Sequence, residues 1–440
     1  MFRNASFSMS SSMSDFLSRR NLLQAAAAAS ALLAGPALAQ FRVEISGVGG
    51  SQLPIALPDF RDESASGQAV AAIIRADLER SGQFKIIDAG PGLFEGSAPN
   101  WSEWRSKQAD ALAAGSVSRL ADGRFDLRYK LWDVVKGADL GGEAHAVTAE
   151  DVRLAAHRIA DTIYQKLTGE RGVFATRMAY VTRAGGRYSL RITDADGEGG
   201  QVALASPEPI ISPAWSPNGR ELAYVSFETR KAVVWVQDLQ TGRRRKLADF
   251  RGSNSAPAFS PDGESVVMTL SREGGSQLFV MNRDGSGVRR LTQSSAIDTE
   301  PVFAPDGRSI YFVSDRGGSP QIYRVAVGGG SPERVTFSGN YNISPSVSPD
   351  GRSLAFVTRL NGSQFRICVM DLASGVVQQI SDGSDDESPS FSPNGRLIVY
   401  ATRSGGRDVL MTSTLDGRIK AKLISSLADV REPTWGPFGR

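Results

Sequence analysis

An eight-residue motif recurs at a constant interval of 44 residues through the second half of this chain. It reads "PAWSPNGR" at 213, "PAFSPDGE" at 257, "PVFAPDGR" at 301, "PSVSPDGR" at 345, "PSFSPNGR" at 389 and "PTWGPFGR" at 433. Equal steps of this kind indicate an internal structural repeat. Ser-Pro-Asp-Gly is typical of a tight turn, because Pro presets φ at the second position and Gly tolerates a positive φ at the fourth.

The residues between the motifs predict four short strands in each repeat. Hydrophobic runs such as "LAYVSF" at 222 and "IYFVSD" at 310 are rich in β-branched and aromatic residues and are bounded by turn residues. Four strands of about 5–6 residues with four connections of about 5 residues account for roughly 42 residues. Four-stranded units repeated radially form a β-propeller, which avoids exposed sheet edges by closing into a ring.

The two ends of the repeat region predict how the ring closes. Three strand runs, starting at 177, 188 and 201, precede the first motif, and a single leading strand follows the last proline at 433. Together they complete one further blade. The sequence therefore predicts a mainly β fold with a six-bladed propeller over residues 171–440, closed by pairing of N- and C-terminal segments.

A small α+β domain is predicted over residues 40–170, between a leader and the ring. Segments 66–82 and 150–169 have apolar residues at helical spacing, and "FKIIDA" at 84 and "RFDLRYKLWDVV" at 124 read as strands. The connection to the ring at 169–174 is short, so we expect the two domains to touch.

Residues 1–39 resemble an export signal. They contain the pair Arg19–Arg20, an alanine- and leucine-rich segment too short for a membrane span, and Ala-Leu-Ala before a cleavage site near Ala39. The arginine pair suggests a twin-arginine leader, with a general secretory signal as the alternative. Either route predicts a periplasmic protein.

Charge and cysteine content narrow the class of protein. Lys and Arg number 50 against 47 Asp and Glu, a balance that gives no reason to expect nucleic-acid binding. The basic run at 242–246 is interpreted as a solvated turn between strands. Cys368 has no partner in the sequence, so we expect a buried thiol and no disulfide.

Catalytic, cofactor and metal motifs are missing from the sequence. The chain has two histidines, His145 in a predicted hairpin and His157 on a predicted helix, and we expect the latter to be a helix-surface or packing residue. There is no Gly-x-Ser-x-Gly elbow and no Cys/His pair at metal spacing. The acidic run at 382–388 lacks the spacing of a calcium loop, so a solvated loop is the preferred interpretation. We therefore predict no enzyme and no cofactor.

Three stretches make the mature sequence similar to the TolB family of the Tol–Pal envelope system. They are "VAAIIRADLERSGQFKIID" at 70, "LTGERGVFATRMAYVT" at 167 and "PEPIISPAWSPNGRELAYVSFE" at 207. The resemblance covers about residues 41–440. It implies a monomeric, non-catalytic periplasmic scaffold that binds the lipoprotein Pal through the propeller, binds TolA through its mature N-terminus and supports outer-membrane constriction at division. Membranes would be reached only through these partners. The alternatives are a propeller-containing hydrolase or lyase, and a propeller that binds cell-wall glycan.

Candidate binding residues follow from the repeat and the resemblance. We expect each innermost strand to begin at the repeated proline, so the variable residues before it should surround one mouth of the ring. These candidates for Pal binding are Ser253, Asn254, Ser255, Asp298, Thr299, Glu300, Asn342, Asp385, Asp386, Glu387 and Arg431. An alternative is that the carboxylates merely cap loops and strand ends. The candidates for TolA binding are Gln40, Phe41, Arg42, Val43, Glu44 and Ile45.

Overall fold

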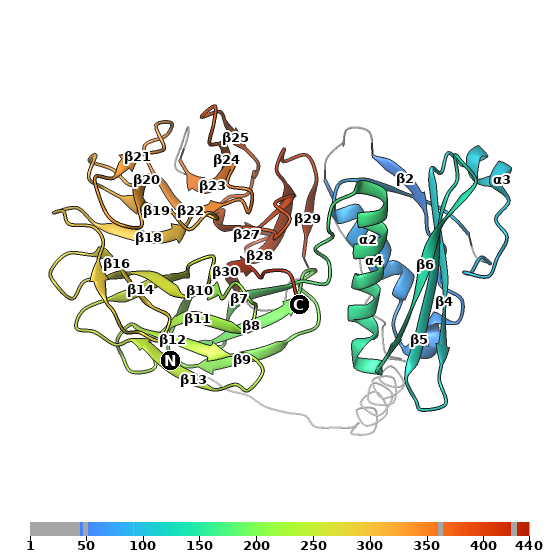
Figure 1. Cartoon of the computed structure of the whole chain (residues 1–440), viewed down its shortest axis with the longest axis horizontal. Coiled ribbons are helices and arrows are strands. Elements are labelled where there is room, and N and C mark those ends of the chain that lie inside the picture. Colours follow the sequence, from blue (N-terminus) through green and yellow to red (C-terminus); the bar gives the residue numbers. More distant parts are fainter. Residues whose placement is uncertain (1–44, 47–51, 91, 360–363, 424–428, 440) are drawn as a thin grey trace, which may run out of the picture. The chain divides into compact units, whose positions relative to one another are not determined.

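The computed structural model describes residues 45–46, 52–90, 92–359, 364–423 and 429–439 (Figure 1). The predicted leader and the candidates from Gln40 to Glu44 lie outside these residues. Val43 to Arg440 form one compact unit.

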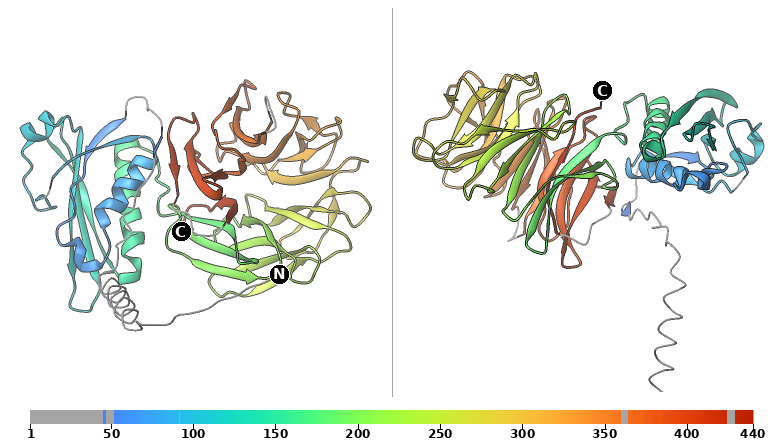
Figure 2. Two further views of the ribbon diagram at one scale, coloured as in Figure 1. Left: turned by 180° about the vertical axis from the view of Figure 1, so that it is seen from behind. Right: turned by 90° about the horizontal axis from the view of Figure 1, so that it is seen from below.

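Six antiparallel sheets form the ring, and the predicted composite blade is confirmed. Strand β30 (Asp429–Trp435) is the innermost strand of the first blade and pairs with β7 (Arg177–Ala184). Residues separated by some 250 positions in the sequence therefore share one sheet, which locks the ends of the ring together. Figure 2 shows the blades arranged around a common axis from two further directions.

The remaining strands follow the repeat in sequence order. The first blade continues with β8 (Arg187–Asp194) and β9 (Gln201–Ser206). The next two blades contain β10 (Ile210–Trp215), β11 (Glu221–Ser226), β12 (Val233–Asp238), β13 (Arg244–Ala248), β14 (Asn254–Phe259), β15 (Ser265–Leu270), β16 (Gln277–Asn282) and β17 (Arg289–Arg290). The last three contain β18 (Asp298–Phe303), β19 (Ser309–Ser314), β20 (Gln321–Ala326), β21 (Glu333–Arg334), β22 (Asn342–Val347), β23 (Ser353–Thr358), β24 (Arg366–Asp371), β25 (Val377–Gln379), β26 (Glu387–Phe391), β27 (Leu397–Ser404), β28 (Arg407–Thr414) and β29 (Lys420–Lys422).

Blades pack face to face, which explains the uninterrupted hydrophobic runs after each turn. In β15, Val266 and Met268 join the apolar cluster shared with the preceding blade, whereas Val267 joins the cluster shared with the following blade. A strand buried on both faces needs apolar residues at every position. Cys368 belongs to such a strand and is fully buried, as predicted, and burial raises the pKa of its thiol to about 12.

The repeated turn has the geometry that its residues predict. The amide of Gly263 donates to the carbonyl of Ser260 at 2.8 Å, and Gly263 has a φ of 77°. The Ser260 hydroxyl donates to Asp262 at 2.5 Å and accepts from the amide of Ser265 at 2.9 Å. The basic run at 242–246, predicted as a turn, extends into β13, where Arg244 pairs with Glu228.

The N-terminal domain is the predicted α+β unit. Its sheet has the order β3-β2-β4-β5-β6, in which β2 pairs in parallel with β3 and β4 and the others are antiparallel. Its elements are β2 (Leu53–Ala56), η1 (Glu63–Ser66), α2 (Val70–Arg80), β3 (Phe84–Ile87), α3 (Trp101–Ser106), β4 (Ala111–Arg119), β5 (Phe125–Asp133), β6 (Ala138–Val147), η2 (Ala149–Asp151) and α4 (Val152–Thr168).

The two long helices bury the apolar stripes that predicted them. Ile73, Ile74 and Leu78 of α2 and Ile159 and Ile163 of α4 lie in one core cluster with residues of the sheet. This cluster also contains residues of the ring, so the predicted contact between the domains is present. Helix α4 ends where Gly169 adopts a left-handed conformation, with a φ of 78°.

A short fifth strand extends the last blade. Strand β1 (Ile45–Ser46) pairs antiparallel with β29, with Ile45 opposite Ala421 and Ser46 opposite Lys420. The segment preceding the N-terminal domain thus adds to the outer edge of a ring blade.

Every innermost strand carries a bulge at the residue before the repeated proline. The pairing register shifts there in all six blades. The residue before the proline has a positive φ of 48–53° in each case; these residues are Ser212, Ala256, Glu300, Ser344, Ser388 and Glu432. Positive φ costs a non-glycine residue about 1–2 kcal/mol, so the ring holds a strained position in every blade.

Glycine substitution should reveal this strain. Ala256→Gly removes the Cβ that disfavours a φ of 48°, which offsets the greater freedom that glycine gives the unfolded chain. Ala258→Gly in the same strand has no such relief. We expect Ala256→Gly to be more stable than Ala258→Gly by about 1–2 kcal/mol in denaturant unfolding. Equal losses in the two variants would contradict strain at the bulge.

Candidate functional site

A central cavity of about 660 Å³ runs between the innermost strands, and residues from all six blades line it. We call this cavity the channel. All six bulge residues line the channel, together with the repeated prolines Pro213, Pro257, Pro301, Pro345, Pro389 and Pro433. The bulges therefore turn a strained backbone position toward the axis of the ring in each blade.

Two of the bulge residues are glutamates that tie neighbouring blades together. Glu300 accepts a hydrogen bond from the amide of Ser344 in the next blade at 2.6 Å. Glu432 accepts from the amide of Ser212 in the same manner. Because a bulge leaves a backbone amide without its ladder partner, each carboxylate satisfies a donor that the repeat itself exposes.

The channel is acidic and partly desolvated. Burial raises the pKa of Glu300, against the opposing hydrogen bond from Ser344. Burial also raises the pKa of Glu432 to about 7, with contributions from the charges of Glu387 and Glu300. Burial raises the pKa of Glu387, and the nearby Arg431 partly opposes this. A ligand that supplied hydrogen-bond donors or positive charge here would favour the ionised carboxylates.

The expectation that every Pal candidate surrounds an open mouth needs correction for four residues. Most innermost strands begin three residues before the proline, so Asn254, Asp298 and Asn342 are the first residues of their strands, and Asp386 directly precedes β26; all four are buried. They occupy one column of the repeat and satisfy polar groups within the ring. Asn254 donates to the carbonyls of Ala232 and Phe250, both at 3.0 Å.

The other three members of this column are also bonded within the ring. Asp298 accepts two bonds from Arg316, at 2.8 and 2.9 Å. Asn342 donates to Gln321 at 2.8 Å, and Asp386 accepts from Ser381 at 2.5 Å. For these four residues the structure supports the capping alternative.

Seven candidates retain solvent access at one end of the innermost strands, and we call them the mouth residues. They are Ser253, Ser255, Thr299, Glu300, Asp385, Glu387 and Arg431. Glu300, Asp385 and Glu387 also line the channel. Arg431 has a side chain that is 61% exposed and pairs with Asp408 at 3.1 Å. Of the TolA candidates, only Ile45 is described, in β1.

Sequence reasoning did not include the whole bulge column among the candidates. Ser212, Ala256, Ser344 and Ser388 line the channel although none of them was among the candidates. The signal was available, because all of them directly precede a repeated proline. These residues were not selected because each innermost strand was expected to start at the proline.

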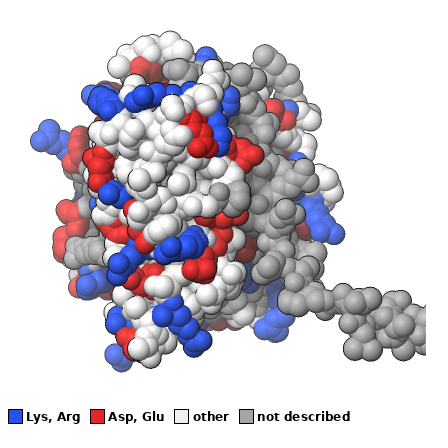
Figure 3. Space-filling view, turned by 90° about the vertical axis from the view of Figure 1, so that its right-hand side faces the viewer, with Lys and Arg blue, Asp and Glu red and all other residues white. Residues whose placement is uncertain are grey.

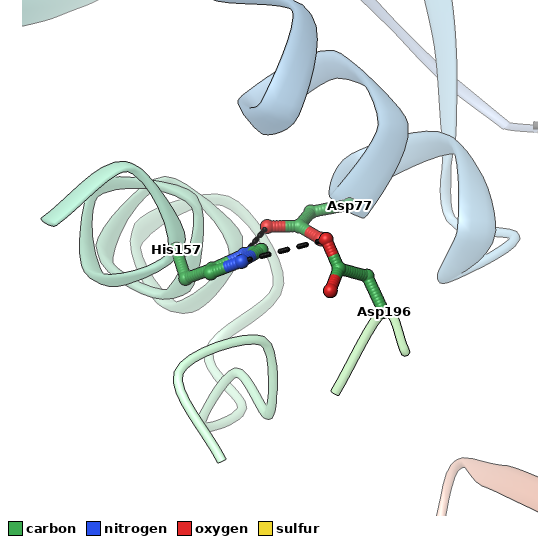
Figure 4. A group of neighbouring side chains, drawn as sticks. All are labelled: Asp77, His157 and Asp196. Carbon is green, nitrogen blue, oxygen red and sulfur yellow. Dashed lines mark hydrogen bonds and ion pairs between the residues drawn. The ribbon is translucent and has the colours of Figure 1, made fainter. Parts of the chain in front are cut away.

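One buried group outside the channel has the composition of a metal site. His157 Nδ1 lies 2.6 Å from Asp77 Oδ2, and His157 Nε2 lies 3.5 Å from Asp196 Oδ2 (Figure 4). All three side chains are buried. His157 is thus a packing residue between the domains, the second of the two roles expected of it.

The contacts of this group favour an ion-pair network over a bound metal. The two imidazole nitrogens face different carboxylates, whereas a metal ion takes one nitrogen and gathers its other ligands around that point. Arg80 already pairs with Asp77 at 2.6 Å, and Arg153 pairs with Asp196. With two guanidinium groups already facing these carboxylates, a divalent ion would leave the buried site with a net positive charge.

Comparison with known proteins identifies the family. The amino-terminal domain model of TolB matches residues 41–140, and the TolB β-propeller domain model matches residues 164–439. The chain belongs to the TolB family.

Individual relatives agree with this family. The chain is 64% identical over 222 residues to the Tol-Pal system protein TolB of Albidiferax ferrireducens and 60% identical over 246 residues to that of Polaromonas naphthalenivorans. These alignments cover 50% and 56% of this TolB-family chain and 52% and 57% of the relatives, so they span about half of each curated protein. The crystal structure of TolB from Acinetobacter baumannii superposes with a TM-score of 0.83 at 41% identity, covering 91% of this chain and 100% of that one.

The described surface of this TolB-family chain carries charges of both signs. On the face drawn in Figure 3, acidic and basic side chains are interspersed. Within the described residues, no helix has the length and apolarity needed to cross a membrane.

Removing the charge of Glu432 should flatten the pH dependence of stability. A carboxyl group with a raised folded-state pKa stabilises the fold fully below its unfolded pKa of 4.5, and this contribution is lost as the pH rises through about 7. Glu432→Gln keeps an oxygen for the Ser212 amide but does not titrate. Between pH 5 and pH 8, wild type should lose up to about 3 kcal/mol relative to Glu432→Gln in urea unfolding.

The exposed Glu264, in the turn after β14, provides the control. Glu264→Gln should follow the wild-type profile of unfolding free energy against pH. If Glu432→Gln also runs parallel to wild type, the carboxyl group of Glu432 does not titrate in this interval.

Proposed function

We propose that this chain is a periplasmic component of the Tol–Pal system that works as a non-catalytic docking protein. In this proposal the mouth residues bind the lipoprotein Pal, and the segment from Gln40 to Ile45 binds TolA, so that the protein supports envelope integrity and constriction at division. Family membership supports the system, and its partners follow from the resemblance of the sequence to that family. Export by the predicted leader would deliver the protein to the periplasm.

The observation that carries the proposal is the contrast between a constant ring and a variable mouth. The turns, prolines and bulges repeat in every blade, whereas the residues just before the bulges differ: Ser253 and Ser255 in one blade, Thr299 in the next, Asp385 and Glu387 further on. Variable polar residues on a rigid frame are suited to recognising one folded partner.

The charge of this surface indicates what the partner must supply. Asp385 is exposed, and Glu300, Glu387 and Glu432 lie around the adjacent channel. Burial raises the pKa of each of these three glutamates, so the site would gain from hydrogen-bond donors or positive charge on the partner. Arg431 offers a single positive group at the rim.

Catalysis has little support. Both histidines of the chain lie outside the ring, one on β6 and the other buried on α4. The channel-lining residues include carboxylates but no histidine or cysteine. A docking function needs only the shape and charge of the mouth.

Added positive charge at the mouth tests the Pal proposal. The double variant Ser253→Lys, Asp385→Lys changes two blades at solvent-exposed positions and should weaken capture of soluble Pal by at least about tenfold. Calorimetric titration of purified Pal into the full mature chain measures this.

A matched control changes the opposite end of the same strand. Glu264 is exposed in the turn after β14, about 20 Å from Ser253 at a strand rise of ~3.3 Å, and Glu264→Lys should leave Pal affinity unchanged. If the wild-type chain does not bind Pal, the proposal that Pal is its partner is wrong. Equal Pal binding by wild type and the double variant would move the site away from the mouth. Binding to isolated cell-wall sacculi without Pal would favour the glycan alternative.

The N-terminal segment provides a second, separable test. Deletion of residues 40–47 removes the TolA candidates and β1, so we expect complete loss of TolA capture with Pal affinity within about twofold of wild type. Replacement by a glycine–serine segment of equal length distinguishes sequence from length. Retained TolA capture in both variants would exclude the segment as the binding site.

A further inference from the structure

The junction between the N-terminal domain and the first blade contains an ion network centred on one histidine. Asp77 lies on α2, His157 on α4, and Asp196 in the turn between β8 and β9 of the first blade (Figure 4). The imidazole lies between the two carboxylates, 2.6 Å from Asp77 and 3.5 Å from Asp196. It therefore joins a helix of one domain to a turn of the other.

The blade's contribution comes from a position of the repeat that is exposed elsewhere. Asp196 lies 88 residues before Asp284 and 220 before Asp416, so all three share one column of the 44-residue repeat. In each turn one oxygen of this carboxylate accepts a hydrogen bond from the backbone amide two residues later in the sequence, at 3.0, 2.8 and 3.1 Å respectively. The second oxygen of Asp196 is thereby aimed away from its own turn, and here it faces Arg153 and His157.

A count of charges fixes which form of the imidazole suits this site. Three carboxylates face it, those of Asp77, Asp194 and Asp196. Two guanidinium groups pair with them: Arg80 with Asp77 at 2.6 Å, and Arg153 with Asp194 at 3.4 Å as well as with Asp196. A neutral imidazole leaves one net negative charge in a buried site, whereas an imidazolium balances it. Uncompensated buried charge is strongly unfavourable.

The pKa directions agree with this count. Burial by itself lowers the pKa of His157, but the charge and hydrogen bond of Asp77 and the charge of Asp196 outweigh it, so the pKa is raised above 6.5. Although burial opposes it, the positive charges of His157 and Arg153 lower the pKa of Asp196. Burial raises the pKa of Asp194, and the charge of His157 opposes this.

Other charged groups face the network from its surroundings. The carboxylate of Asp161 on α4 accepts hydrogen bonds from the backbone amides of Phe174 and Ala175 in the interdomain connection, at 2.7 and 3.1 Å. Burial raises the pKa of Asp161 to about 6. Burial raises the pKa of Glu198 in the blade turn, and the charge of Arg153 opposes this increase. Arg177 on β7 interacts with Asp194. When ionised, the carboxyl groups of Asp161 and Glu198 add negative charge near the network, which favours a cation at His157.

We propose that protonated His157 is the ionic bridge that holds the N-terminal domain against the first blade, and that loss of its proton loosens this junction. The bridge stabilises the junction fully below pH 6.5, which is the pKa of the histidine side chain in the unfolded chain. This contribution is lost as the pH rises through the higher pKa that His157 has in the folded protein. The junction is therefore held closed below pH 6.5 and loosens as His157 loses its proton at higher pH.

The chain has only two histidines, which makes a direct test possible. In ¹⁵N-labelled full mature protein, the imidazole signals can be assigned with His145→Gln, and the His157 signal should be mainly that of an imidazolium at pH 6.5 and change to that of a neutral imidazole at higher pH. Hydrogen exchange of residues 194–200 and of α2, corrected for intrinsic rates, should accelerate by about tenfold over the same pH interval in which His157 titrates.

Three variants separate the bridge from general destabilisation. Asp196→Asn should shift the His157 titration to lower pH and the opening of residues 194–200 with it. Asp284→Asn makes the same change at the equivalent exposed turn and should alter neither. His157→Gln, if it folds, should exchange rapidly at every pH.

Three results would overturn the proposal. They are a neutral His157 at pH 6.5 in wild type, exchange at residues 194–200 that does not follow its titration, and an unaltered titration in Asp196→Asn. The wild-type measurement decides the matter even if His157→Gln does not fold.

Discussion

Closure of the ring is the constraint on which the rest of this structure depends. The pairing of β30 with β7 joins the C-terminal strand to the start of the repeat region, so the first blade has its full four strands and the ring is closed. Once closed, each blade packs on two neighbours, and the middle strands become buried on both faces. Valines and methionines at consecutive positions in β15 are a direct consequence. The stability of any blade therefore depends on its neighbours as well as on its own sheet.

The same closure creates the channel and its strain. Six innermost strands surround one axis, and each carries a bulge before its proline, at a backbone conformation that only glycine adopts freely. Glu300 and Glu432 use the bulge for a contact between blades, which places carboxylates in a partly desolvated channel. Architecture and electrostatics are thus coupled: the feature that shapes the ring also makes its centre acidic.

Repeat positions acquire different roles according to their neighbours. Asp284 and Asp416 stabilise exposed turns, whereas the equivalent Asp196 reaches a histidine of another domain. Asn254, Asp298, Asn342 and Asp386 are variable in sequence yet bury their polar groups within the ring. Variation in a repeat column therefore does not by itself mark a binding surface, and solvent access must be known before a residue is assigned to one.

The sequence by itself determined the ring, its six blades, its closing strands and the helices of the N-terminal domain. These depend on local turn chemistry, on hydrophobic periodicity and on a repeat that copies the same local preferences six times. Only the tertiary structure decided where the innermost strands start, which polar residues before the prolines face solvent, and what His157 contacts. Those outcomes depend on groups far apart in the sequence, such as Asp77 with His157 and Glu432 with Ser212. Their distances follow from how blades and domains pack, and no local pattern in the sequence encodes them.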